Sequence, residues 1–294
     1  MLGDFTPEGT VQSRLLCEEI SKRSDGTCIL AFSRGKDVLG CWVWLRQFFH
    51  TIIPFHWTYA PGISFIEHSL NYYEQIFNTR IERHLNGETS EGLMRGWWQT
   101  KESRERTKSL GRKPFELDDS AAIIRDKYNC PKAYMAISMT MNDNIFRRLN
   151  LKKLDENGNL TFEGGIKENR LVFYPCFDWT LDLILEASVK NGIYLPDDYL
   201  MENRSLNWVT VKNIEPIMEL YPDDFERMQR VFPLLKGMWC RNQFRRMKIT
   251  SNGVLKKTVR EVLREVKLQE LENGQREADE GKSGKRLASG RRKV

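Results

Sequence analysis

One short segment near the start of the chain constrains its fold more than any other. Residues 27–32, TCILAF, form an apolar, β-rich run of the length expected for a buried strand. The loop SRGKD follows at 33–37, and the apolar stretch VLGCWVWLRQFF after it is long enough for a helix packed against a sheet. A strand, a glycine-containing loop and a helix in this order predict the opening of a parallel βαβ unit.

Strand-forming and helix-forming patterns continue to alternate beyond this unit. PFHWTYAPG predicts a second strand and its turn, KAYMAISMT a third strand, and RLVFYPCFDW a further strand. Helical patterns cover ISFIEHSLNYYEQIF, ELDDSAAIIRDKY and TLDLILEASVKNG, and two more follow around 211–221 and 223–236. The predicted fold class is α/β, with a Rossmann-like parallel sheet and a helical C-terminal extension.

Charge and hydropathy exclude some classes of protein. The 46 Lys and Arg residues exceed the 40 Asp and Glu residues by the six basic residues of 281–294, so the rest of the chain is balanced. The net charge is therefore no evidence that the folded domain binds nucleic acid. Apolar runs are short and broken by charges, and the first residues, MLGDFTPEGT, lack the pattern of a signal peptide. We expect a cytoplasmic protein that does not bind membranes.

Cysteine and histidine are too scattered for a typical metal site. The six cysteines are at least 11 residues apart, no C-x-x-C motif occurs, and there are four histidines. We therefore expect no iron–sulfur cluster and no zinc, and we interpret the thiols as small buried apolar groups.

The loop at 33–37 has the chemistry of an anion site. Backbone N–H groups of a short glycine turn and the start of a helix attract negative charge, and Lys36 adds a cation. The Ser33 hydroxyl can donate to a phosphate, whereas Asp37 suits a site where a nucleotide brings a metal. The loop matches neither a Walker A motif nor G-x-G-x-x-G. An ordinary βα turn with exposed polar residues is the alternative.

The same loop resembles that of a known family. LAFSRGKDV is similar to the S-x-G-K-D-S loop of the phosphoadenosine phosphosulfate (PAPS) reductase-like family, within the PP-loop ATP pyrophosphatase, or adenine nucleotide α-hydrolase-like, superfamily. The resemblance covers about 60 per cent of the chain, roughly 27–200, through three further segments in the family's order: YAPGISFIEHSLNYYEQIF, MAISMTMNDNIFRR and FYPCFDWTLDLILEASVKNGIYLPDDY.

The resemblance implies a fold, a ligand and a set of residues. It predicts a PAPS reductase-like nucleotide-binding domain at 27–200. Outside this range the residue pattern itself predicts an N-terminal helix at 1–26, a helical extension at 201–272 and a disordered basic tail at 273–294. The implied ligand is ATP or PAPS with Mg²⁺, bound at the carboxyl ends of the strands. Lys36 and Asp37 are the implied catalytic residues, with Asp37 meeting the metal. The implied nucleotide-binding residues are Ser33, Arg34, Gly35, Lys36, Asp37, Asp143, Arg147 and Arg148.

Departures from the family pattern leave three functions open. Val38 replaces the last serine of the loop, and Thr140 replaces an arginine of the third segment. The last cysteine, Cys240, has no paired thiol of the kind a thiol-dependent reductase uses. The leading hypothesis is cleavage of ATP between its α and β phosphates to activate an acceptor, in sulfur or nucleic-acid modification. A genuine PAPS reductase and a catalytically idle nucleotide- or DNA-binding module are the alternatives.

The resemblance and two basic segments also suggest partners. Relatives act with a GTPase or, on phages and mobile elements, stand beside a ParB-like protein, which implies a protein partner here. Residues 95–114 carry seven basic and two acidic side chains and a Trp pair. This stretch is either an exposed charged loop over the nucleotide site or a lid that closes on nucleic acid. The basic tail would add non-specific affinity for nucleic acid.

Overall fold

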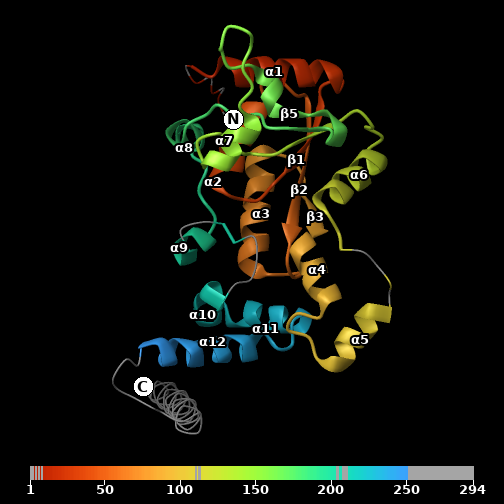
Figure 1. Cartoon of the computed structure of the whole chain (residues 1–294), viewed down its shortest axis with the longest axis vertical. Helices are drawn as coiled ribbons and strands as arrows, with labels where there is room; N and C mark the ends of the chain where they lie inside the picture. Colours follow the sequence, from red (N-terminus) through yellow and green to blue (C-terminus); the bar gives the residue numbers. More distant parts are fainter. Residues whose placement is uncertain are drawn as a thin grey trace, which may run out of the picture. The chain divides into compact units, whose positions relative to one another are not determined.

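The computed structural model describes residues 3, 5, 7, 9–109, 111, 114–202, 205–206 and 211–250 (Figure 1). The chain divides into two compact units, Met1–Lys236 and Gly237–Val294, and the sheet lies in the first. Across the described ranges, no helix has both the length and the apolar character needed to cross a membrane.

A mostly parallel sheet forms the centre of the first unit. Its order is β3-β2-β1-β4-β6-β5, and every pairing is parallel except that of β5 with β6. The order reverses between β1 and β4, which creates a switch point at the carboxyl end of β1. The predicted α/β class with a parallel sheet is confirmed. The strands are β1 Thr27–Ala31, β2 Thr51–Thr58, β3 Glu82–Leu85, β4 Tyr134–Ala136, β5 Ile166–Lys167 and β6 Val172–Phe173.

Helices cover both faces of this sheet, with α2 and α8 on one side and α6 on the other (Figure 1). The α-helices are α1 Val11–Arg23, α2 Lys36–Leu45, α3 Ser64–Phe77, α4 Gly87–Arg95, α5 Lys101–Ser109, α6 Leu117–Lys127, α7 Ile145–Leu151, α8 Leu181–Lys190, α9 Asp198–Glu202, α10 Val211–Leu220, α11 Pro222–Val231 and α12 Leu235–Thr250. Two 3-10 turns cover Phe162–Gly165 and Glu168–Arg170.

The β1–α2 unit forms as its sequence predicts. Cys28, Ile29 and Leu30 of β1 are completely buried, as expected for a strand with neighbours on both sides. A glycine stands inside α2 because α8 approaches closely. A Cβ on Gly40 would lie 2.8 Å from the backbone carbonyl oxygen of Ile184. This close packing fixes α2, and with it the loop that precedes α2, against the rest of the unit.

Two strands of the sheet were not predicted, β3 and the two-residue β5. β3 pairs with β2 at one edge and has the sequence ERHL, which has no apolar alternation. KAYMAISMT is consequently the fourth strand in chain order rather than the third, and its regular pairing is limited to Tyr134–Ala136. The strand predicted in RLVFYPCFDW is shorter still, because only Val172–Phe173 pairs before the chain turns.

The basic stretch at 95–114 is not one loop. Helix α4 ends in it at Arg95, and α5 occupies Lys101–Ser109 with no buried side chain. Its end returns to the domain, where Pro114 lines a cavity described below. The charged side chains of α5 are exposed, and a contact with nucleic acid stays a prediction.

The helices that follow the last strand are bonded to the helices that cover the sheet, as α11 is to α3. Asp224 of α11 is completely buried and accepts hydrogen bonds from the backbone N–H of Ser64 (2.8 Å) and from its hydroxyl (2.6 Å), at the start of α3. A carboxylate in this position satisfies backbone donors that the helix cannot satisfy itself. The predicted C-terminal helices are confirmed here. The heptad-like stretch at 254–272 and the predicted disordered tail at 273–294 lie outside the described residues.

Candidate functional site

The loop at 33–37 joins the carboxyl end of β1 to α2. Gly35 is the N-cap of α2, and Lys36 and Asp37 form its first turn. Arg34 has a left-handed backbone, with φ of +66°, which is unusual for a residue with a side chain. The Arg34 side chain is held by residues of α3 and α9, and these contacts keep its backbone in this conformation.

A buried ion pair holds Arg34. Its guanidinium donates to both carboxylate oxygens of Asp198, at 3.0 and 2.7 Å, and to the Ser69 hydroxyl at 3.0 Å. Asp198 also accepts from the backbone N–H of Leu206 at 2.7 Å. Neither side chain of the ion pair is exposed. A contact from the Arg34 guanidinium to a nucleotide would therefore require this pair to open.

The other loop side chains are partly exposed. The Lys36 ammonium pairs with the carboxylate of Asp37, at 2.9 and 3.1 Å, and about 30 per cent of each side chain is accessible to solvent. The Ser33 hydroxyl accepts a long hydrogen bond, 3.4 Å, from the Gly35 N–H. The backbone N–H of Lys36 donates to the Tyr199 hydroxyl oxygen at 3.0 Å. The first N–H of α2 is thus already bonded to a tyrosine that follows α8 in the chain.

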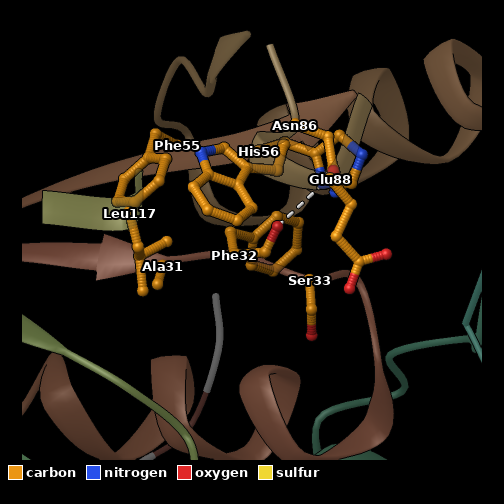
Figure 2. Close-up of a pocket in the computed structure, with 9 residues that line it drawn as sticks. Ala31, Phe32, Ser33, Phe55, His56, Asn86, Glu88 and Leu117 are labelled. Carbon is orange, nitrogen blue, oxygen red and sulfur yellow. Dashed lines mark hydrogen bonds between the residues drawn. The ribbon is translucent and has the colours of Figure 1, made fainter. Parts of the chain in front are cut away.

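A cavity of about 300 Å³ opens beside this loop (Figure 2). Phe55 and Leu117 lie toward one end of it, whereas Ser33 and the Glu88 carboxylate lie toward the other. Trp57 adds a second aromatic wall and is fixed by a hydrogen bond from its indole N–H to the Ser120 hydroxyl, 2.9 Å. The lining residues are Ala31, Phe32, Ser33, Phe55, His56, Trp57, Asn86, Glu88 and Leu117.

The volume and walls of this cavity suit a small, largely apolar ligand. Its volume lies at the lower end of the range for small-molecule pockets, and its walls are mainly apolar and aromatic. The polar groups are concentrated at the end near the loop at 33–37. It lies at the carboxyl ends of β1 and β2, where ligands bind in open parallel sheets.

His56 supports one wall of the cavity as a neutral side chain. It is 2 per cent exposed, and its Nδ1–H donates to the backbone carbonyl oxygen of Phe32 at 2.8 Å. Burial, reinforced by the positive charge of Arg34, lowers the pKa of His56 to about 3. The imidazole therefore carries no charge near neutral pH, and it fixes the backbone at the end of β1.

A second cavity, of about 330 Å³, adjoins the first and shares Trp57, Glu88 and Leu117 with it. Its remaining lining residues are Gly87, Glu91, Pro114, Phe115 and Glu116. Three carboxylates make this side of the site acidic. One of them, Glu91, pairs with Arg95 at 2.6 Å.

The second predicted cluster lies after β4. Asp143 accepts from the backbone N–H of Thr140 at 3.1 Å and from the Arg147 guanidinium, while Arg148 makes a long contact of 3.4 Å to the Asn142 side chain. These hydrogen bonds stay within the segment that follows β4. The loops after β1 and β4 flank the switch point, but the side chains of the two clusters do not pair with each other in these hydrogen bonds. Nucleotide contacts from this cluster stay a prediction.

Metal and thiol chemistry have little support among the described side chains. Within those ranges, no three His, Cys, Asp or Glu residues are grouped so that they could hold a metal ion. Asp37 as a contact to nucleotide-bound Mg²⁺ stays a prediction. Burial raises the pKa of the Cys17, Cys28 and Cys176 thiols above their ordinary range, so these groups are protonated and unreactive.

The sequence did not indicate several residues that build the site. Trp57 and Leu117 form walls of the first cavity, and Asp198 and Tyr199 contact the loop. The only available signal was the segment LPDDY, which is part of the family resemblance but carries no chemistry on spacing alone.

Comparison with known proteins gives a distant structural likeness and no sequence match. No protein-family model matches the chain, and no curated protein matches it. NH3-dependent NAD synthetase from Campylobacter jejuni subsp. jejuni NCTC 11168 is similar over 84% of this chain and 98% of its own, with 11% identity and a TM-score of 0.38. U34-tRNA thiolase NcsA from Methanococcus maripaludis is similar over 76% of this chain and 78% of its own, with 11% identity and a TM-score of 0.37. At this level the likeness concerns the fold alone and does not assign a function.

Proposed function

We propose that this chain binds an adenine nucleotide in the manner of PAPS reductase-like, PP-loop proteins. The base would occupy the cavity between Trp57 and Leu117, and the phosphates would meet the loop at 33–37. The single observation that carries this proposal is the continuity of the two features. Ser33 is both a lining residue of the cavity and the first residue of the loop. An apolar cavity beside the loop that leads into a helix N-terminus suits a ligand with a flat base and an anionic tail.

The proposed reaction is transfer of an adenylyl group from ATP to an acceptor. A nucleophilic oxygen of the acceptor forms a bond to the α-phosphorus, and the bond from that phosphorus to the bridging oxygen breaks to release pyrophosphate. Lys36 would neutralise negative charge that develops on the phosphate oxygens, and the start of α2 would add to this effect. Asp37 would contact Mg²⁺ brought by the nucleotide, once its carboxylate is released from Lys36.

Binding is tested by thermal unfolding and calorimetry with ATP and, separately, with PAPS. A nucleotide present at 100 times its Kd should stabilise the fold by about 2.7 kcal/mol. Lys36→Ala should weaken ATP binding about tenfold or more, because it removes a cation at the phosphates. Lys132→Ala is a matched control. Lys132 pairs with Asp25 at 3.1 Å and precedes β4, so it lies at the amino ends of the strands, whereas the loop lies at their carboxyl ends.

The same titrations separate the alternatives. Stabilisation by PAPS but not by ATP would favour a PAPS reductase over an adenylyl transferase. Failure of both nucleotides to bind would refute the proposal. Exchange of radiolabelled pyrophosphate into ATP, with and without candidate partners, then tests adenylyl transfer itself. GTPase-like and ParB-like proteins are the partners that the family resemblance suggests.

An idle nucleotide-binding module is the second candidate, and one observation favours it. Lys36 pairs with Asp37, and its backbone N–H is already bonded to Tyr199, so neither group faces an open anion site in this arrangement. This candidate predicts ATP binding without pyrophosphate exchange under any condition. Titration of single-stranded and duplex DNA at several salt concentrations tests the proposed nucleic-acid contact of 95–114.

A further inference from the structure

Four residues that follow α8 in the chain lie over the loop at 33–37. We call Asp198, Tyr199, Ser205 and Leu206 the cover residues. The Tyr199 hydroxyl oxygen lies 3.0 Å from the backbone nitrogen of Lys36. The Ser205 hydroxyl lies 3.0 Å from the point where a Cβ on Gly35 would stand. The Tyr199 hydroxyl therefore accepts from the first N–H of α2, and the Ser205 hydroxyl lies close to the N-cap Gly35.

The buried ion pair holds the cover residues in place. Asp198 binds the Arg34 guanidinium through both carboxylate oxygens, and its second partner is the N–H of Leu206. The Asp198 carboxylate thus connects Arg34 of the loop to Leu206, the last of the cover residues. Ser69 of α3 completes this arrangement by accepting a hydrogen bond from Arg34.

The surroundings of this pair are only partly satisfied. Three buried polar atoms near Arg34 have no hydrogen-bond partner among the described residues: Arg34 Nε, His56 Nε2 and the Tyr59 hydroxyl. Unsatisfied buried polar groups cost free energy in folded proteins. The cost of these three groups offsets part of the stabilisation that the ion pair gives the folded protein.

A nucleotide and the cover residues compete for the same donor. The N–H of Lys36 makes one well-aligned hydrogen bond, so a phosphate oxygen that accepts from it must replace the Tyr199 hydroxyl. Because Ser205 lies against Gly35, phosphates at the loop also need the space that the cover residues fill. Opening the Arg34–Asp198 pair would in addition release a guanidinium beside the loop.

We propose that the cover residues are an autoinhibitory element of the nucleotide site, with the Tyr199 hydroxyl as a stand-in for a phosphate oxygen. This inference rests on the proposed function. Nucleotide binding displaces Tyr199 from Lys36, and the cover residues return when the site empties. The protein is therefore a weaker nucleotide binder than its loop alone would be, by the free energy of this contact.

Tyr199→Phe tests this inference because it removes only the hydroxyl. The probe is α,β-methylene-ATP, which cannot be cleaved between its α and β phosphates, and affinity is measured by calorimetry on the full chain. Tyr199→Phe should bind this analogue about two- to tenfold more tightly, the effect of deleting one competing hydrogen bond. Tyr194→Phe is the matched control, since Tyr194 is 75 per cent exposed and its ring lies on α3 rather than on the loop.

A second measurement does not depend on nucleotide binding. Hydrogen–deuterium exchange of peptides that span 33–39, without nucleotide, should be faster in Tyr199→Phe than in the parent and in Tyr194→Phe. Unchanged exchange, or weaker binding by Tyr199→Phe, would overturn the inference. If neither protein binds the analogue while exchange at the loop still accelerates, the nucleotide proposal is wrong and the cover contact is upheld.

Discussion

The guanidinium of Arg34 and the carboxylate of Asp198 form a two-pronged ion pair that is completely buried, although 164 residues separate them. It joins the loop after β1 to the first residue of α9. The pair keeps a residue with φ of +66° in place and brings Tyr199 onto the start of α2. The geometry of the candidate phosphate site therefore depends on a carboxylate that lies far away in the sequence.

Asp198→Asn should destabilise the fold strongly. The amide keeps the shape of the side chain but leaves the buried charge of Arg34 without a counter-charge, which costs about 3–5 kcal/mol. Urea unfolding measures this loss. Asp118→Asn is the matched control, because Asp118 also accepts two hydrogen bonds from one guanidinium, that of Arg170, at 2.7 and 2.8 Å, but more than 40 per cent of each side chain is exposed. Its loss should stay below about 1 kcal/mol. Equal losses in the two variants would contradict a special role for burial.

The stability of the fold should fall on mild acidification because of His56. Its pKa in the folded protein, about 3, lies below its ordinary value of 6.5. The unfolded chain therefore takes up the proton first as the pH falls, so the contribution is present above pH 6.5 and is lost as the pH falls toward 3. Between pH 7 and pH 5 the loss should be about 2 kcal/mol.

Urea unfolding at the two pH values measures this dependence. His56→Gln should reduce the pH dependence, because glutamine can still donate to Phe32 but does not titrate. His68→Gln, at an exposed position on α3, should keep the dependence of the parent protein. A parent protein whose stability is equal at pH 7 and pH 5 would refute the prediction.

Filling the cavity should weaken nucleotide binding without unfolding the protein. Leu117→Trp places a large side chain between the two cavities that Leu117 lines. We expect ATP affinity to fall about tenfold or more, while the midpoint of thermal unfolding without nucleotide changes little. Ile123→Trp is the control on the same helix, since Ile123 is 48 per cent exposed and lines neither cavity. Undiminished ATP binding by Leu117→Trp would place the base elsewhere.

Gly35→Ala should disturb the cover residues, and Ser205→Gly should correct the disturbance. The φ of Gly35, −72°, suits alanine, but the new Cβ would lie 3.0 Å from the Ser205 hydroxyl. We expect Gly35→Ala to cost about 1 kcal/mol in the parent protein and close to nothing in the Ser205→Gly background. Chemical unfolding of all four proteins gives the coupling energy. A coupling energy of zero would show that Gly35 and Ser205 are not in contact.

The β1–α2 unit was predictable because its signals are local. A short apolar run, a polar glycine loop and a long apolar stretch specify a buried strand, a turn and a buried helix without reference to any other segment. The edge strand β3 gave no such signal. It is held by hydrogen bonds to β2, and its sequence ERHL has the composition of a loop.

The basic stretch at 95–114 is a second segment whose secondary structure was not predicted from its local sequence. Its charges are visible in the sequence, and they predicted exposure correctly. They did not predict that Lys101–Ser109 would be helical, because charged residues with good helix propensity are compatible with both a loop and an exposed helix.

Residues 33–37 specify the chemistry of the loop without any distant segment: a hydroxyl, a glycine, an ammonium and a carboxylate at the start of a helix that follows a buried strand. The surroundings of these groups come from tertiary packing. The aromatic cavity needs β2, α4 and α6 at one edge of the sheet, and the cover of the loop needs Asp198 to reach Arg34. Such pairings depend on how distant segments pack in three dimensions. The separation of residues along a chain carries no record of that packing.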